Sequence, residues 1–220
     1  MRVLLLLATV LAGVTAQAPC CFPAQWEAFA GILEGYYLPS TDTPGEVEGY
    51  DWVSYDYVNK RLMSNLSLVT DNDTPIRGVV IIDFKKGRRY DIFGNNCTSK
   101  IYKGDIPKNC VPDNANSTGP SYFGAGNNKL VFNSFQFLYN NLPVFMTFTQ
   151  RDCIPVSETV IGGIAPGIKG FVGITYTGLT VGIKDPRVFE PPKDCYHSNE
   201  EAQPGGSLGS VIGRKKRGLD

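Results

Sequence analysis

Six cysteines are the residues of this 220-residue chain with the most definite chemistry. They stand at positions 20, 21, 97, 110, 153 and 195, and no two of them have the Cys-x-x-Cys spacing of many zinc sites. An even number of cysteines predicts disulfides if the chain reaches an oxidising compartment. Cys20 and Cys21 are adjacent, and the strained ring that would join them favours a distant partner for each. Spacing alone does not select among the remaining pairings.

Catalytic chemistry lacks its usual residues. The single histidine, His197, lies near the carboxyl end, so a histidine-based triad or a histidine-rich zinc site cannot be assembled. No Walker loop occurs, and the Gly-x-Ser-x-Gly sequence at residues 205–209 lies near the carboxyl end, in a stretch without the strand and helix pattern that a nucleophile elbow needs. A pair of carboxylates, as in glycosidases, stays open, but nothing in the sequence favours it. The sequence therefore predicts a binding protein and no enzyme.

Acidic residues offer a second kind of site, because calcium prefers carboxylate oxygens. The calcium candidates are Asp51, Asp56, Asp71 and Asp73. No stretch matches the twelve-residue EF-hand loop, so these acids would have to converge from separate loops. Solvated acidic loops are the alternative interpretation and the favoured one. Calcium is thus the one cofactor that the sequence leaves open.

Four Asn-x-Ser/Thr sequons occur, none with proline in the middle. Their asparagines are Asn65, Asn72, Asn96 and Asn116. Several sequons in one secreted chain predict at least one N-glycan, and an occupied asparagine must face solvent. Asn96 ranks last, because Cys97 in its middle position makes glycosylation compete with disulfide formation.

The amino terminus has the pattern of a secretory signal peptide. Arg2 precedes an apolar run, and small residues lead to Ala16. The run is shorter than the roughly 20 residues of a membrane helix, and no later run is long enough. We expect a signal peptide at 1–16, a mature start at Gln17 and no transmembrane segment. The predicted address is extracellular, with the lysosomal lumen as the alternative.

Charge is distributed unevenly along the chain. The formal net charge is zero, but without Arg2 and the residues from 205 onward, 16 basic residues face 20 acidic ones. A mildly acidic body argues against nucleic acid as a partner. Residues 197–220 lose the apolar pattern and end in the basic run Arg214–Arg217, so a disordered tail is expected there. The run is either a solvated tail or a cleavage site for processing proteases.

Short segments rich in Val, Ile, Phe, Tyr and Thr, separated by 24 Gly and 15 Pro, predict an all-β fold. Residues 78–93 and 130–149 form two predicted hairpins, and Phe171–Ile183 a third around Thr177–Gly178. Residues 51–58 alternate as a half-buried strand does. The spacing is typical of a sandwich or an open barrel, built as one domain over 17–196.

Four segments together resemble the ependymin family over nearly the whole mature chain. They are Pro19–Glu27, Ser54–Asp56 with Asn59 and Arg61, Asp152–Thr159, and Gly182–Cys195. The last two are the most specific, since Asp-Cys-x-Pro-Val-x-Glu-Thr and the closing motif are followed almost residue for residue. Ala28 departs from the glycine usual in the family, which affects a local backbone preference more than the fold.

The resemblance implies two curved antiparallel sheets around a hydrophobic cavity, a half-open barrel like that of bacterial lipoprotein carriers of the LolA/LolB type. It also implies a homodimer, and it associates the chain with calcium, extracellular matrix and lipid. For the cysteines it implies Cys97 with Cys195, Cys20 with Cys153 and Cys21 with Cys110, where Cys20 and Cys21 can be exchanged. It carries over no catalytic residues.

Two functions follow from these observations. The first is binding of a lipid or other amphiphile in the implied cavity, where apolar ligand surface would leave water. The residues expected to line the cavity are Phe135, Phe137, Tyr139, Val144, Met146 and Phe148. These side chains could instead simply fill the core. The second function is a calcium-associated component of an extracellular matrix, a mineralised one included, or of cell adhesion.

Overall fold

The computed structural model describes residues 20–139, 141–165 and 168–202. Twelve strands and one short 3-10 helix, η1, make up this part of the chain. The strands are β1 (Gln25–Leu38), β2 (Thr43–Asp56), β3 (Arg61–Thr70), β4 (Pro75–Asp83), β5 (Arg88–Phe93), β6 (Asn96–Ile101), β7 (Asn116–Ala125), β8 (Asn128–Tyr139), β9 (Leu142–Thr149), β10 (Pro155–Ala165), β11 (Ile168–Val181) and β12 (Tyr196–Glu201), and η1 spans Pro186–Phe189. The all-β prediction is confirmed. The predicted signal peptide and most of the predicted tail lie outside the described residues.

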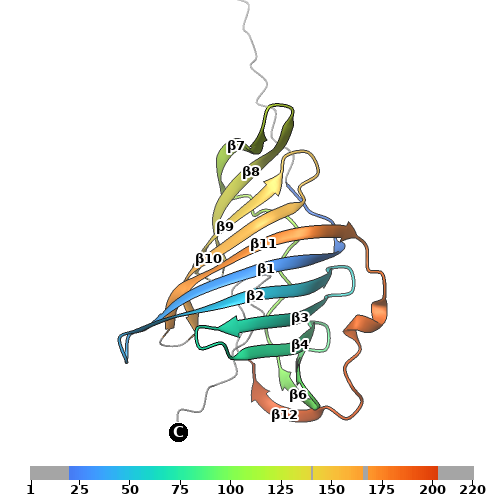
Figure 1. Ribbon diagram of the computed structural model, residues 1–220. Helices are drawn as coiled ribbons and strands as arrows, with labels where there is room; N and C mark the ends of the chain where they lie inside the picture. Colours follow the sequence, from blue (N-terminus) through green and yellow to red (C-terminus); the bar gives the residue numbers. More distant parts are fainter. Residues whose placement is uncertain (1–19, 140, 166–167, 203–220) are drawn as a thin grey trace, which may run out of the picture.

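All twelve strands belong to one open sheet, in the order β12-β6-β5-β4-β3-β2-β1-β11-β10-β9-β8-β7 (Figure 1). The expectation of two separate sheets is therefore wrong. Its two expected halves are joined because β1 pairs with β2 on one side and with β11 on the other. Neighbouring strands are antiparallel except for β12 and β6, which are parallel.

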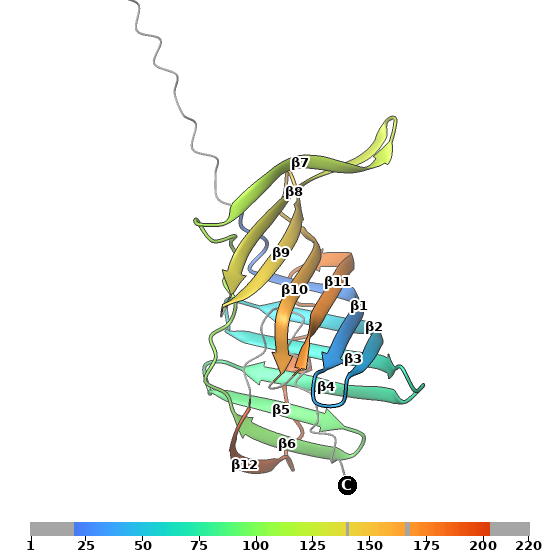
Figure 2. The same cartoon turned by 90° about the vertical axis from the view of Figure 1, so that its left-hand side faces the viewer.

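The sheet is strongly curved, which gives it a concave inner face and a convex outer face (Figure 2). The contacts of Phe22 demonstrate the curvature. The centre of its ring lies 5.7 Å from that of Tyr55 on β2 and 5.8 Å from that of Phe148 on β9. In a flat sheet these strands, four places apart, would be separated by roughly 19 Å. The main hydrophobic core lies on the inner face. It includes Trp26 and Ile32 of β1, together with Ile106 from the segment that links β6 to β7.

The linking segment, residues 102–115, crosses the inner side from one end of the sheet to the other. The Tyr55 hydroxyl donates to the Pro107 carbonyl at 2.7 Å, and the Val111 amide donates to the Cys20 carbonyl at 2.8 Å. Three disulfides join Cys20 to Cys153, Cys21 to Cys110 and Cys97 to Cys195, and the second of them fastens the linking segment. The prediction of disulfide bonding is thus confirmed, with the pairs that the resemblance implied.

Two of the three predicted hairpins are present, as β4 with β5 and β8 with β9. The third is wrong, because residues 168–181 form the single strand β11. Gly178 has a φ of 61° there, and the register against β1 shifts between Thr177 and Thr180. The Thr177–Gly178 signal therefore marks a β-bulge, which uses the same left-handed glycine conformation as a turn.

The first residues of the predicted disordered tail, 197–201, are in a strand. Residues 196–201 form β12, where Tyr196 pairs with Thr98 of β6. Cys195 is bonded to Cys97 on the same strand, so the disulfide brings this polar segment against the sheet edge. Residues 203–220, including the Arg214–Arg217 run, lie outside the described part of the chain.

Candidate functional site

The six residues expected to line a cavity share one stretch of the inner face. Phe135 is opposite Met146, and Phe137 is opposite Val144, in the β8–β9 pair. Val144, Met146 and Phe148 are buried in the main core. Phe135, Phe137 and Tyr139 are only partly buried and pack against that core. The structure therefore brings the six together, with half of them filling the core and half at its border.

Farther along the same face lie carboxyl groups that sequence reasoning did not place there. Glu158 and Asp51 are each 2% exposed. The Tyr176 hydroxyl donates to Glu158 Oε2 at 3.0 Å. Ala30 is in register with both Asp51 and Tyr176, so the two lie on either side of its small methyl group. A polar cluster thus sits within an otherwise apolar interior.

Burial also perturbs Asp51 strongly within this cluster. Ser64 Oγ donates to Asp51 Oδ2 at 2.5 Å, while Asp51 Oδ1 is buried without a hydrogen-bond partner among the described residues. Burial raises the pKa of Asp51 to about 7, against the lowering effect of the Ser64 hydrogen bond. Asp51 is consequently protonated in part near neutral pH.

The calcium candidates do not converge. Asp51 is on the inner face, and Asp56 is buried among hydrogen-bond donors on the outer face. Asp71 and Asp73 lie exposed in the turn between β3 and β4. Within the described ranges, no three Asp, Glu, His or Cys side chains are grouped as a metal site would need. The four acids thus form no common site.

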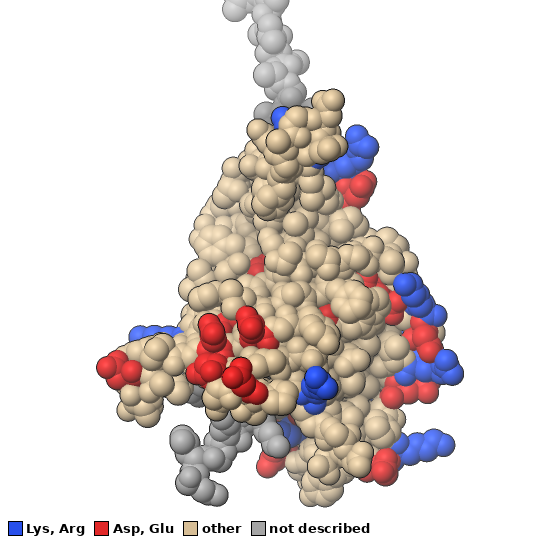
Figure 3. Space-filling model, in the orientation of Figure 1, with Lys and Arg blue, Asp and Glu red and all other residues tan. Residues whose placement is uncertain are grey.

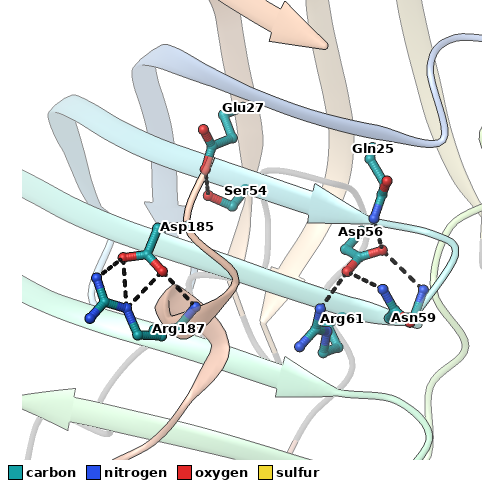
Figure 4. Close-up of polar contacts among 8 residues, drawn as sticks. All are labelled: Gln25, Glu27, Ser54, Asp56, Asn59, Arg61, Asp185 and Arg187. Atoms are coloured by element: carbon teal, nitrogen blue, oxygen red, sulfur yellow. Dashed lines mark hydrogen bonds and ion pairs between the residues drawn. The ribbon is translucent and has the colours of Figure 1, made fainter. Parts of the chain in front are cut away.

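Asp56 anchors a polar network on the outer face (Figure 4). Its carboxylate accepts hydrogen bonds from Gln25 Nε2 at 2.9 Å, from the amide and the side chain of Asn59 at 3.0 and 2.8 Å, and from an Arg61 guanidinium nitrogen at 2.6 Å. Burial alone would raise the pKa of Asp56, but these donors outweigh it and hold the pKa below its usual value. The Arg61 guanidinium also lies 4.4 Å from the centre of the Phe189 ring.

Arg61 and Gln25 of this network also contact residues 182–195, which we name the outer strap. The Lys184 amide donates to Glu27 Oε2. The other carboxylate oxygen of Glu27 accepts from Ser54 (Figure 4). Phe189 of the strap packs with Met63, Ile81 and Tyr90 in a second, smaller core on the outer face. The motifs around Gln25–Glu27, Ser54–Arg61 and Gly182–Cys195 therefore meet in one place, and their role there is to attach the strap.

The rest of the outer face is open and apolar. An open groove of about 640 Å³ runs across β3, β2, β1, β11 and β10, with Leu33, Tyr50 and Val69 in its lining. Leu33 is 49% exposed and Tyr50 57%. In Figure 3 this face shows few charged side chains, except for acidic ones gathered at one end of β2 and β3, where Glu46, Glu48 and Asp71 are exposed.

Sequence reasoning missed this surface, although β1 carries a signal for it. Phe29, Leu33 and Tyr37 are apolar on its outer face, while Trp26 and Ile32 are apolar on its inner face. A strand that is apolar on both sides is typical of one that is covered on both sides. The strap does not cover Phe29, Leu33 and Tyr37, which remain 40% to 49% exposed.

Comparisons with known proteins agree with this description. The family model described as Ependymin matches residues 72–195, more than half of the chain. Ependymin-related protein 1 of Haliotis asinina is 29% identical over 206 residues, covering 86% of this chain and 96% of that protein. Development-specific protein LVN1.2 of Lytechinus variegatus is 28% identical over 159 residues, covering 65% and 84%.

Among solved structures, the crystal structure of a LolA superfamily protein from Nitrosomonas europaea covers 78% of this chain and 93% of its own, with a TM-score of 0.33 and 8% identity. A likeness this distant says nothing about a ligand. No helix within the described residues is long and apolar enough to cross a membrane. The family model, with both relatives, establishes that the chain belongs to the ependymin family.

Proposed function

We propose that this ependymin-related protein is a non-catalytic binder of amphiphiles, and that the apolar chain of the ligand packs on the inner face along β8. The observation that carries the proposal is the partial exposure of three side chains, those of Phe135, Phe137 and Tyr139. They are large and apolar and sit beside a filled core, yet they stay partly exposed. Removing apolar ligand surface from water at such a border gains roughly 25 cal/mol per Å².

Adjacent residues of β8 offer a matched test. Phe137 is on the inner face, whereas Leu138 is on the outer face and 66% exposed. We expect Phe137→Asp to weaken binding of a fluorescent fatty acid at least tenfold and Leu138→Asp to leave it unchanged. Phe137→Ala serves as a milder variant if the aspartate disturbs folding. Equal binding by all three variants, or absence of binding by the wild type, would refute the proposal.

The three disulfides and the family membership are consistent with a protein of the secretory pathway. The proposed final address is extracellular, with the lysosomal lumen as the alternative. We also propose N-glycans on the sequons at Asn65, Asn72 and Asn116, and with lower occupancy at Asn96. All four asparagines are exposed, which supports this part of the proposal.

The open outer face supports a homodimer. Soluble monomers seldom expose a contiguous apolar surface larger than a few hundred Å², and here exposed apolar residues extend over β1, β2, β10 and β11, among them Phe29, Tyr50, Ile161 and Phe171. We propose that a second copy of the chain covers them. The alternative function as a calcium-associated matrix component gains no support from the separated positions of its candidate acids.

A further inference from the structure

The β7–β8 hairpin extends beyond the rest of the sheet. Pairing between β8 and β9 begins at Phe132 and Thr149, so residues 120–131 form a two-stranded projection, which we name the arm (Figure 2). One strand of the arm is roughly 20 Å long. A hairpin without a third strand or a packed layer has little stability of its own. The side chains on the surface of the arm should therefore be of a kind that suits the partner or medium that stabilises it.

The arm is apolar on both faces. Tyr122 pairs with Val131, and Phe123 pairs with Leu130, so the two pairs project to opposite sides. Tyr122 is 52% exposed and Phe123 55%. A single protein partner would cover one side of such a hairpin and leave the other in water. A lipid surface would receive both sides at once.

Charge separates this end of the molecule from the acidic body. From residue 114 to residue 150, Lys129 is the only charged residue. Its ammonium group lies 4.2 Å from the centre of the Tyr122 ring, so the cation stays close to the apolar surface. Aromatic rings and lysines with this arrangement are favourable at the boundary between lipid headgroups and acyl chains. The missing carboxylates remove repulsion from anionic headgroups.

We propose that the arm docks the protein on lipid bilayers by inserting Tyr122, Phe123, Leu130 and Val131 into the interfacial layer. β7 is the edge strand of the sheet, and its unpaired backbone groups need water, so the arm lies in this layer and does not enter the hydrocarbon core. The arm continues into β8, where Phe135 and Phe137 face inward. Docking would therefore bring the proposed binding site to the membrane, and this last step alone rests on the proposed function.

Vesicle sedimentation with the full secreted chain tests the docking. We expect the protein to sediment with phosphatidylcholine vesicles that contain phosphatidylserine, and the double variant Tyr122→Ser/Phe123→Ser to partition at least tenfold less. Val181→Ser, which removes a residue that is 72% exposed outside the arm, is the matched control and should change nothing. Lys129→Gln should weaken binding to anionic vesicles and leave any binding to pure phosphatidylcholine vesicles unchanged.

A second readout locates the contact. Tryptophan emission of Phe123→Trp should shift to the blue when vesicles are added, whereas the wild type should show no such shift. Wild-type protein that fails to sediment, or unchanged emission, would overturn the proposal. So would an arm variant that only lowers the molar mass in solution, since the arm would then be a protein contact. Retained binding of the fluorescent fatty acid by the arm variants separates this test from that of the inner site.

Discussion

The outer face of the sheet is apolar in both of its halves, but only one half is covered by another segment of the chain. Over β3 to β6, the strap covers Met63 and Ile81 with Phe189 and is fastened by the Cys97–Cys195 disulfide. Over β1, β11 and β10, residues such as Leu33 and Phe171 are left in water. Both halves belong to one continuous sheet. The difference shows that the strap covers only one part of the apolar outer face. The proposed homodimer would cover the other part.

The covered half also contains a buried charge, whereas on the outer side of the open half the one described acidic or basic residue that is buried is Glu27, which the strap contacts. The Asp56 carboxylate can be buried as a charged group because Gln25, Asn59 and Arg61 donate hydrogen bonds to it. A buried carboxylate without such donors would be strongly destabilising. Three of the four segments that resemble the ependymin family meet at this attachment, where their residues hold the strap against the sheet.

The largest expected effect is loss of this attachment. Arg61→Met would leave Asp56 buried without its cation, and we expect the free energy of unfolding to fall by about 3 to 5 kcal/mol. Urea denaturation of the purified protein measures it. Arg187→Met removes the cation of the exposed Asp185 ion pair in the strap and should have no measurable effect. Equal losses from the two substitutions would contradict the role given to the network.

A matched pair of phenylalanines compares the two halves directly. Phe189→Ala empties a site in the covered half and should lower the unfolding free energy by about 3 kcal/mol. Phe171→Ala, in the open half, should change the stability of the isolated monomer by less than about 1 kcal/mol. Light scattering should instead show weaker self-association for Phe171→Ala. A dimer that is unaffected by it would exclude this face as the interface.

The pH dependence of stability concerns two carboxyls of β2 that face opposite sides. Asp51 ionises near pH 4 when unfolded and near pH 7 in the folded protein. The unfolded chain therefore loses this proton first as the pH rises, so the contribution of Asp51 to stability falls between about pH 4 and 7 and is level above. Asp56, with its lowered pKa, acts in the opposite direction: its contribution is present above about pH 4 and is lost in acid.

Asp51→Asn isolates the first contribution. We expect the variant to exceed the wild type in unfolding free energy by up to about 4 kcal/mol at pH 8, which corresponds to a pKa difference of about three units, and to match it at pH 4. Denaturation at several pH values provides the measurement. A constant difference at all pH values would show that Asp51 keeps its ordinary pKa in the folded protein.

Local patterns predicted the local structure well. The strand pairs expected within residues 78–93 and 130–149 are present, and alternation along β8 and β9 correctly placed Phe137 and Val144 on one face. Gly178 was misread because a turn and a bulge use the same backbone conformation. Features that depend on residues close together in the sequence, such as hairpins and the face on which a side chain lies, could therefore be predicted.

Long-range arrangement was not readable in the same way. The pairing of β1 with β11 decides that there is one sheet, and alternation within a strand does not name its neighbour. The burial of Asp51 and Glu158 was likewise invisible, because a carboxylate in a strand looks the same whichever face it occupies. The apolar outer side of β1 was the one long-range clue present in the sequence.

The position of β1 has a consequence for biosynthesis. Trp26, in the middle of the sheet, pairs with Val181, which is added to the growing chain 155 residues later. Residues 25–101 can form their hairpins as they emerge, but β1 remains an unprotected edge until β11 has been made. Nascent chains that stall before residue 181 should therefore depend most on chaperones of the secretory pathway, because they present an unsatisfied, apolar strand for aggregation.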